Sequence, residues 1–357
     1  MQALSRFLRV ELAPPDYLSM PSAGIDISTS GIKLARIREH VHGLELSAFD
    51  EVALPTGAVV GGELRDPGAV ASTLKDLMKK HKVRFANVAL PEARGYLFEA
   101  VVQADEPGAQ KIAVEQHLEE YVPLPSQDVE FTVAPVRKGE QGTQLVGVGY
   151  ARRVVEETLA VFDEARVRVR ALESETFALP RALLPVRTDE TVLIIDIGKT
   201  TTKLLIATAR LPRFVTTLDI GGHALTLAVQ KHFGVSEEEA KRVKAEKGIA
   251  PGSGNEEYLA AMLSTVSVIR DEIMKRLEYW QSRANATHEP VSRVLLVGGN
   301  ATVLGLPEYL EASLKVPVAL GDVFTNFAPR EVWLPPLEYT ASLAYGTAIG
   351  LALRDYA

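Results

Sequence analysis

The sequence predicts an α/β protein with two lobes, and its length and an internal repeat carry this prediction. With 357 residues, the chain is longer than one ordinary core requires and long enough for two domains of usual size. The stretch "GIDISTSGIKLARI" at residues 24–37 is echoed by "IIDIGKTTTKLLI" at residues 194–206. Each copy has an apolar run with one Asp, a turn of small residues and a Lys-Leu pair, so we expect two homologous lobes.

Strand and helix patterns divide the chain into five predicted parts. No low-complexity segment or flexible linker separates them. They are an N-terminal tail at 1–22; a first lobe at 23–91 with 171–188 and 340–357; an inserted α+β subdomain at 92–170; a second lobe at 189–222 with 291–339; and a helical subdomain of the second lobe at 223–290.

The first lobe is predicted to open with a meander of three antiparallel strands. The strands cover 23–28, 32–37 and 44–54, and the turn signals Ser-Thr-Ser-Gly and His-Gly separate them. A helix over 66–83 begins with Asp66 as cap. A buried strand then follows at 85–91.

The inserted subdomain alternates strands and helices. We expect strands at 94–102, 129–136, 143–151 and 167–173, and helices at 108–122 and 152–165, the first of which ends before Pro123. A short helix at 174–184 leads to the second meander, which begins at Val192. Three helices, a strand with a Gly-Gly turn, another helix and an Ala-rich closing helix at 339–356 complete the prediction.

Composition and charge exclude several classes of protein. Hydrophobic residues make up 46% and charged residues 24% of the chain, which is a globular composition. The net charge of −7 and the lack of a basic run argue against a nucleic-acid partner. The absence of cysteine excludes disulfides, thiolate metal sites and a Cys nucleophile. The seven His residues show no paired metal-ligand spacing, which disfavours a metal-dependent hydrolase.

Membrane and targeting signals are weak. No apolar run approaches the roughly 18 residues of a membrane span, and the first residues lack an uninterrupted signal-peptide core. Leu4, Phe7 and Leu8 form one short apolar face beside Arg6 and Arg9. Two interpretations stay open for this face: it touches a membrane, or it belongs to a tail or helix that packs on the body.

The repeated hairpins have the residue types of a phosphate site. Small residues in a tight turn let backbone amides approach an anion closely. A carboxylate at the end of the strand then suits Mg²⁺, which keeps much of its water and takes few protein carboxylates. Asp26 or Asp196 alone is equally compatible with an ordinary turn residue. The identical spacing in both copies favours two hairpins that grip one nucleotide's phosphates from both sides.

A third element is the stretch "VLLVGGNATVLGLPEYL" at 294–310. A buried strand followed by Gly298-Gly299 and a helix allows close backbone approach to a flat ligand or its ribose. A plain strand-to-helix turn explains the same pattern, so this motif alone decides nothing.

In this order, the elements resemble the actin-like ATPase superfamily, and the resemblance covers nearly the whole chain. It implies a two-lobed actin-like (ribonuclease H-like) ATPase fold that binds ATP or ADP with Mg²⁺. Asp26 and Asp196 would organise the metal, through water. The residues implied to line the nucleotide site are Ser28, Thr29, Ser30, Lys33, Gly198, Lys199, Thr200, Thr201, Thr202, Gly221, Gly222, Gly298, Gly299 and Asn300.

Three further side chains have a functional and a structural interpretation each. By the resemblance, Glu175 would position the attacking water; as a plain feature it is a carboxylate at a helix start. Lys241 and Lys244 occupy the region where family members contact adenine and ribose, although a charged helix face is often merely solvated. Lys199 stands where the family more often has a small residue, which puts turnover in doubt more than binding.

Within this superfamily, the chain is similar to the PilM family of type IV pilus assembly proteins. The similarity rests on "SAGIDISTSGIKLARI", on "YVPLP" after an acidic helix, on an insertion of FtsA type in the first lobe, and on "ESETFALPRAL". It implies a cytoplasmic protein at the inner face of the inner membrane that binds ATP and holds the short N-terminal cytoplasmic tail of a PilN-like membrane protein. Other pilus platform or motor proteins would be further partners, membrane association would be mainly indirect, and ATP hydrolysis would be at most slow.

Two other functions remain open on the sequence. One is an FtsA-like filament-forming membrane tether, and a homo-oligomer also stays open as an interpretation. The other is a sugar or metabolite kinase of the same fold, which needs a further Asp as general base. No Asp-x-Asn motif near a Gly-rich turn is evident before the insertion.

Overall fold

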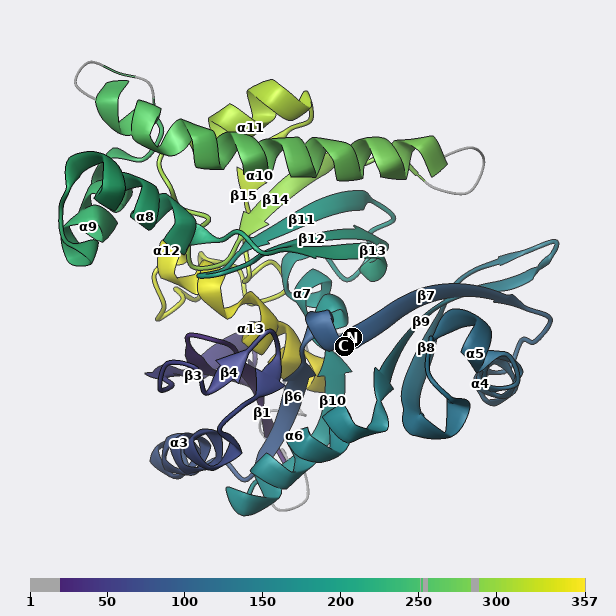
Figure 1. The fold of residues 1–357 in the computed structure, drawn as a ribbon. Helices are drawn as coiled ribbons and strands as arrows, with labels where there is room; N and C mark the ends of the chain where they lie inside the picture. Colours follow the sequence, from purple (N-terminus) through teal and green to yellow (C-terminus); the bar gives the residue numbers. More distant parts are fainter. Residues whose placement is uncertain (1–19, 251, 253–255, 284–288, 357) are drawn as a thin grey trace. The chain divides into compact units, whose positions relative to one another are not determined.

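The computed structural model describes residues 20–250, 252, 256–283 and 289–356 (Figure 1). The apolar face predicted at Leu4, Phe7 and Leu8 therefore lies outside the described residues. Contacts divide the chain into two compact units. Unit 1 comprises Met1–Thr188, Arg210–Arg213 and Asp322–Ala357, and unit 2 comprises Asp189–Ala209 and Phe214–Gly321.

Unit 1 is built on a five-stranded sheet in which β1 pairs antiparallel with β2 and parallel with β6. β2 pairs antiparallel with β3, and β10 pairs parallel with β6. The meander predicted from the sequence is therefore present, with two parallel strands beside it. The strand order is β10 (Arg168–Ser174), β6 (Phe85–Leu90), β1 (Ser22–Ile27), β2 (Gly31–His40) and β3 (Gly43–Ala53).

Helices α3 (Pro67–Lys80) and α6 (Arg152–Glu164) pack together and share a core with this sheet (Figure 1). The cap predicted for α3 forms, because the side chain of Asp66 accepts the N–H of Ala69 at 3.0 Å. The apolar face of α3 buries Leu74, and α6 contributes Phe162 to the same cluster.

The insertion is a three-stranded antiparallel sheet covered on one face by two short helices (Figure 1). Phe98, Leu118 and Leu145 form its separate core. The single helix predicted at 108–122 is broken into two, and only its end before Pro123 is as the sequence predicts. The elements are β7 (Gly95–Val102), β9 (Gly142–Ala151), β8 (Val129–Gly139), α4 (Pro107–Glu115) and α5 (Leu118–Tyr121).

Three segments group differently from the predicted parts, and the shortest is Arg210–Arg213, which was expected in the second lobe and groups with unit 1. The insertion was expected to run to residue 170, yet α6 packs into the core of the five-stranded sheet and β10 extends that sheet. Segment 322–339, expected in the second lobe, groups with unit 1. Its backbone and side chains bond there, since Ala328 N–H donates to Leu44 and Asn326 Nδ2 donates to Arg181 and Leu184. Local sequence patterns predicted the helices and strands, but contacts between distant segments determine the domain boundaries.

Unit 2 has a sheet of the same strand order as unit 1. β11 pairs antiparallel with β12 and parallel with β14, and β14 pairs parallel with β15. The order is β13 (Leu211–Leu218), β12 (Thr202–Thr208), β11 (Thr191–Ile197), β14 (Arg293–Val297) and β15 (Val318–Leu320). The repeat in the sequence thus corresponds to a repeat of the topology.

The helical subdomain of unit 2 contains the three helices expected from the sequence. α8 packs against α9 and α10, and α10 also contacts α11 (Figure 1). Ser236 caps α9 by accepting the N–H of Glu239 at 3.2 Å. The three helices are α8 (Gly222–Phe233), α9 (Glu237–Lys247) and α10 (Glu256–Arg283), and α11 (Leu306–Leu314) follows β14.

The predicted closing helix is broken into short pieces in unit 1. Their sequence is rich in Ala and Gly, and Gly350 lets the chain lie directly against α7 (Glu175–Leu183), because a Cβ there would overlap the carbonyl oxygen of Ala178. The pieces are α12 (Tyr339–Ser342), η3 (Leu343–Tyr345), α13 (Gly346–Ala352) and η4 (Leu353–Tyr356). The remaining short elements are β4 (Val59–Val60), β5 (Glu63–Leu64), η1 (Glu92–Arg94) and η2 (Ser126–Asp128).

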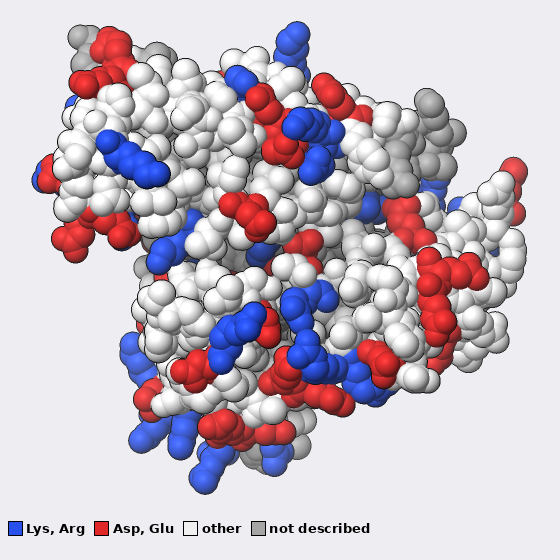
Figure 2. Space-filling model, in the orientation of Figure 1, with Lys and Arg blue, Asp and Glu red and all other residues white. Residues whose placement is uncertain are grey.

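On the face shown in Figure 2, acidic and basic side chains are interspersed and neither sign forms a continuous stripe. Among the described helices, none combines the length and the apolar composition needed to cross a membrane.

Candidate functional site

The two repeated hairpins have the same register. In unit 1, Asp26 of β1 lies opposite Lys33 of β2. In unit 2, Asp196 of β11 lies opposite Lys203 of β12. Each Asp therefore lies two positions before its loop. It lies on the middle strand of its five-stranded sheet, which is β1 in unit 1 and β11 in unit 2. Both Asp residues are partly exposed.

The two loops also close with the same hydrogen bond. Ser28 N–H donates to the carbonyl oxygen of Gly31 at 2.9 Å in unit 1. Gly198 N–H donates to the carbonyl oxygen of Thr201 at 2.9 Å in unit 2. The repeated sequence thus folds into the same tight turn twice.

Several loop amides point to anion binding. Within the part of the chain that the structure describes, no hydrogen bond is donated by the backbone N–H of Thr29 or Ser30 in the first loop. The same holds for Lys199, Thr200 and Thr201 in the second. Successive unengaged amides in a tight turn form a concavity that suits a phosphate oxygen. The side chains of Lys199 and Thr200 are exposed beside these amides.

The second loop is held from behind by the Gly221-Gly222 pair at the start of α8. Gly222 N–H donates to Gly198 and His223 N–H donates to Lys199, both at 2.9 Å. A Cβ at Gly221 would lie 2.7 Å from the carbonyl oxygen of Lys199. The close approach explains the double glycine. It also means that the first amides of α8 serve the loop rather than a ligand.

Asn300 ties the Gly-Gly turn after β14 to the same loop. Its backbone N–H donates to Ile197 at 3.1 Å, and its Nδ2 donates to the carbonyl oxygen of Gly198 at 3.0 Å. A Cβ at Gly222 would overlap Asn300 Oδ1, so this glycine makes room for the amide. Gly298 has φ +92°, and a Cβ there would overlap Asp196 Oδ1. Gly299 is exposed.

Lys244 of α9 completes this cluster. Its Nζ donates to Asn300 Oδ1 at 2.7 Å and to the carbonyl oxygen of Gly222 at 3.1 Å. Burial, and then the positive charge of Lys241, lower the pKa of Lys244 below its ordinary value. Lys241 is exposed and pairs with Glu237 at 2.8 Å. Of the two predicted lysines, only Lys244 contacts the loop segments in unit 2.

The first loop is more self-contained. The hydroxyls of Ser28 and Ser30 lie 3.0 Å apart, and a Cβ at Gly31 would overlap the carbonyl oxygen of Val52. Lys33 is buried, and its Nζ pairs with Glu51 of β3 at 3.1 Å. The ammonium thus already has one anionic partner, while a contact from Lys33 to a phosphate stays a prediction.

Two predicted site residues are engaged in structural contacts. Thr202 is fully buried, and its Oγ1 donates to the carbonyl oxygen of Ile220 at 2.7 Å. Glu175 is buried at the start of α7, where its Oε1 accepts the N–H of Glu92 at 2.6 Å. Burial, together with the charges of Glu175 and Glu92, raises the pKa of neighbouring Tyr150. A role for Glu175 in positioning water stays a prediction.

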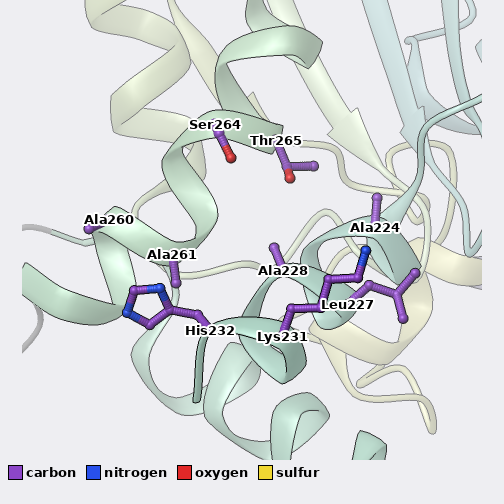
Figure 3. A pocket seen from close by; sticks show the side chains of 9 residues that line it. All are labelled: Ala224, Leu227, Ala228, Lys231, His232, Ala260, Ala261, Ser264 and Thr265. Carbon is purple, nitrogen blue, oxygen red and sulfur yellow. The ribbon is translucent and has the colours of Figure 1, made fainter. Parts of the chain in front are cut away.

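A groove of about 630 Å³ between α8 and α10 lies apart from this cluster in unit 2 (Figure 3). Its lining consists mainly of small side chains, with Lys231 and His232 on α8 and Ser264 and Thr265 on α10. None of the residues predicted for nucleotide binding lines it. No cluster of three or more His, Asp or Glu suited to a metal occurs among residues 20–250, 252, 256–283 and 289–356.

Two sheets of one topology, each ending its first strand in the same kind of loop, define an actin-like ATPase fold. Solved structures with this arrangement include MreB5 of Spiroplasma citri bound to AMPPNP, 14% identical with a TM-score of 0.55 over 92% of this chain and 93% of that one. EutJ, an ethanolamine utilization protein of Carboxydothermus hydrogenoformans, is 16% identical with a TM-score of 0.50 over 99% of both chains.

The family model described as type IV pilus assembly protein PilM matches residues 24–356, so the chain belongs to this family. A solved PilM-PilN type IV pilus biogenesis complex is 23% identical, with a TM-score of 0.76 over 94% of this chain and 99% of that one. The resemblance noted in the sequence is thereby confirmed. The family match favours neither the FtsA-like tether nor the metabolite kinase.

Proposed function

We propose that this protein binds ATP through its two hairpin loops and, in the type IV pilus machinery, holds the N-terminal cytoplasmic tail of a PilN-like membrane protein. The observation that carries the nucleotide part is the cluster in unit 2 that fixes the second loop. There Lys244 donates to Gly222 and to Asn300, and Asn300 donates to Gly198 of the loop, while the loop amides of Lys199 to Thr201 stay open.

The loops and the cluster have separable tasks in this proposal. The loop amides hold phosphate oxygens, and Lys244 places a positive charge near them. The Gly298-Gly299-Asn300 turn lies beside the second loop, where backbone can approach the ribose or base. Of the remaining loop-lining residues, Ser28, Ser30 and Gly221 fix loop shape, as their contacts indicate. Lys33 would contact a phosphate, in competition with its pairing to Glu51.

The donor set also fits magnesium. Mg²⁺ binds through one or two carboxylates plus substrate phosphates and waters, and each hairpin offers one partly exposed carboxylate, Asp26 or Asp196. When bound, the ion would neutralise phosphate charge. The protein's own part is to hold each carboxylate at the end of a buried strand.

The partner part of the proposal follows from the family. The PilM-PilN complex among the fold relatives pairs a PilM protein with PilN, and we infer the same kind of partner for this chain. The protein would then work at the cytoplasmic face of the inner membrane, attached through that partner. ATP turnover is at most slow in this role, because a nucleotide that stabilises one arrangement of the protein suffices for assembly.

Calorimetric titration tests both parts. We expect the wild-type chain to bind ATP with Mg²⁺, and to bind a synthetic peptide with the tail sequence of the PilN-like protein from the same organism. Asn300→Asp removes the Nδ2 donor to Gly198 and should weaken ATP binding about tenfold, at roughly 1.4 kcal/mol for one lost hydrogen bond.

Asn326→Asp is the matched control, because Asn326 also uses its Nδ2 on backbone carbonyls, those of Arg181 and Leu184 in unit 1. It should lower stability without changing ATP affinity. A wild-type chain that binds neither ATP nor the peptide would overturn the proposal. Equal effects of the two variants on ATP binding would remove the role given to Asn300.

A further inference from the structure

Lys244, Asn300, Gly198 and Gly222 form a closed cycle of four hydrogen bonds in unit 2. Lys244 Nζ donates to Asn300 Oδ1 at 2.7 Å and to the carbonyl oxygen of Gly222 at 3.1 Å. Asn300 Nδ2 and the backbone N–H of Gly222 both donate to the carbonyl oxygen of Gly198, at 3.0 Å and 2.9 Å. The cycle therefore joins α9, the Gly-Gly-Asn turn and the start of α8 to the first residue of the second loop.

The side-chain amide of Asn300 fits this cycle in one orientation. An amide has an acceptor at its oxygen and donors at its nitrogen, whereas an ammonium only donates and a carbonyl oxygen only accepts. With Oδ1 toward Lys244 and Nδ2 toward Gly198, both contacts are satisfied. Rotated by half a turn, the amide would place its NH₂ group against the ammonium and its oxygen against the carbonyl oxygen. The charge on Lys244 thus determines which end of Asn300 faces the loop.

A second contact keeps Lys244 close to Asn300. After the end of α9, Ile249 N–H donates at 2.8 Å to the carbonyl oxygen of Leu304, which lies in the segment between β14 and α11 that also carries Asn300. Gly248 has φ +55°, and a Cβ there would overlap the same carbonyl oxygen. Helix α9 is therefore attached to this segment at two points, so the ammonium is held in place by the fold itself.

Gly198 connects the cycle to the loop amides. Its own N–H closes the turn on Thr201 at 2.9 Å, and its carbonyl group belongs to the planar peptide unit that carries the N–H of Lys199. In a trans peptide unit the N–H points away from the C=O, so fixing the carbonyl oxygen directs the N–H of Lys199 away from the cycle. This N–H is the first of the loop amides that donate no hydrogen bond within the described residues.

We propose that Lys244 is a positioning residue for nucleotide binding: by orienting the amide of Asn300, it holds the Gly198–Lys199 peptide unit so that the N–H of Lys199 faces the phosphates. This inference rests on the proposed function and adds the route by which Lys244 acts, which runs mainly through Asn300. Lys244 and Asn300 then act as one unit, and the loss of either removes the same contribution to ATP affinity.

A double-mutant cycle tests this, with ATP affinity measured by calorimetric titration in Mg²⁺. Lys244→Met removes the ammonium and keeps an unbranched side chain, and Asn300→Ala removes the amide. Each single variant should bind ATP about tenfold more weakly than the wild type. The double variant should stay within about thirtyfold of the wild type, because Lys244 has no amide left to orient. Circular dichroism and an unfolding curve establish that each variant is folded.

Lys241 gives the matched control cycle, because it lies on the same helix as Lys244 and pairs with Glu237 at 2.8 Å. Whatever Lys241→Met alone does to ATP affinity, its effect should multiply with that of Asn300→Ala. A spectroscopic measurement reads the amide directly. In ¹⁵N-labelled protein, the side-chain amide signals of Asn300 are those lost in Asn300→Ala, and their exchange with solvent should be faster in Lys244→Met than in the wild type.

A double variant that binds ATP more than about thirtyfold more weakly than the wild type would overturn the inference, since Lys244 would then act on the nucleotide independently of Asn300. Unchanged solvent exchange of the Asn300 amide in Lys244→Met would overturn it as well. Both results leave ATP binding by the wild type, and so the proposed function, intact. A wild type that binds no ATP would overturn the proposed function, and this inference with it.

Discussion

The loops of the two units have the same closing backbone hydrogen bond but differ in the residues that surround them. Both close with the same N–H to carbonyl hydrogen bond, and both follow a strand with the same Asp-to-Lys register. In unit 2, Gly222 and Asn300 bond to the loop at Gly198, and Lys244 from a third segment bonds to both of them. In unit 1, the loop is stabilised by its own serines and by the neighbouring strand β3.

This difference indicates how one duplicated hairpin acquires two tasks. In the proposed function, the turn would supply amides for phosphate in both units. In the same proposal, the helical subdomain and the Gly-Gly-Asn turn would add recognition of the rest of a nucleotide, in unit 2 only. The comparison therefore predicts unequal sensitivity: loop-shape residues matter in both units, and side-chain contacts to the nucleoside matter in unit 2.

The largest expected effect concerns the strands before the loops. Gly24 in β1 corresponds to Ile194 in β11, because each stands two residues before its Asp. A Cβ at Gly24 would overlap the carbonyl oxygen of Ala348 in α13, so the close packing in unit 1 requires glycine. We expect Gly24→Ala to lower the free energy of unfolding by about 3 kcal/mol.

Urea unfolding measures this, with Ile194→Val as the control in the other repeat. Ile194 is fully buried, and the loss of one methyl group there should cost about 1 kcal/mol. If the Gly24→Ala protein were as stable as the Ile194→Val protein, the first repeat would tolerate a side chain at this position, as the second repeat does.

The next prediction tests whether the two carboxylates are equivalent. Asp26→Asn and Asp196→Asn should each weaken ATP binding between about ten- and a hundredfold when Mg²⁺ is present, since each loses an ion that orients the phosphates through water. In EDTA the same variants should bind ATP as the wild type does. Asp219→Asn, at an exposed carboxylate next to Ile220, is the control. Equal losses with and without Mg²⁺ would contradict a metal role.

Much of this arrangement could be predicted because it is written in local pattern. The buried apolar runs of β1 and β11 and the small residues of both turns lie within a few positions of one another, and each Gly-Gly pair is itself a local signal. The contacts at Lys244 and Asn300 could be suspected only from the resemblance. The sequence gives Lys241 and Lys244 the same helix, and only the fold turns one toward Gly222 and pairs the other with Glu237.

The domain boundaries, and the structural contacts of several predicted site residues, could not be predicted from local sequence pattern. Phe162 of α6 reads as any apolar helix residue, and only the packing against α3 assigns it to the main sheet. In the sequence, Thr202 looks like one more small residue of a phosphate loop, whereas in the structure its hydroxyl donates to the carbonyl oxygen of Ile220. Such contacts join segments far apart in the chain, where periodicity carries no information.

The third prediction concerns Lys244. Lys244→Met should weaken ATP binding about tenfold, through loss of the charged donor to Gly222 and Asn300 beside the loop. Lys275→Met, at an exposed lysine that pairs with Glu272 on α10, should leave it unchanged. Comparable losses in both variants would mean that overall positive charge, and not the position of Lys244, matters.

The lowered pKa of Lys244 predicts that ATP affinity depends on pH. Bound phosphates favour the protonated amine, so the pKa of Lys244 should rise when ATP binds. ATP affinity should therefore fall as the pH increases from the pKa of the free protein to the pKa of the complex. Titrations between neutral and alkaline pH should show this fall in the wild type and a flatter profile in Lys244→Met. The same slope in both would exclude Lys244 as the titrating group.

The smallest effect belongs to the first loop. Lys33 is buried between strands and shares its charge with Glu51, whose side chain is 42% exposed. Glu51→Gln removes the competing anion, so we expect ATP affinity to rise about two- to threefold, the modest size of a partly exposed pair. Glu45→Gln is the control, because Glu45 pairs with Arg38 in the same sheet, away from the loop. A fall in ATP affinity for Glu51→Gln would mean that Glu51 positions Lys33 rather than competing for it. The first loop would then depend on a neighbouring strand, as the second loop depends on Asn300.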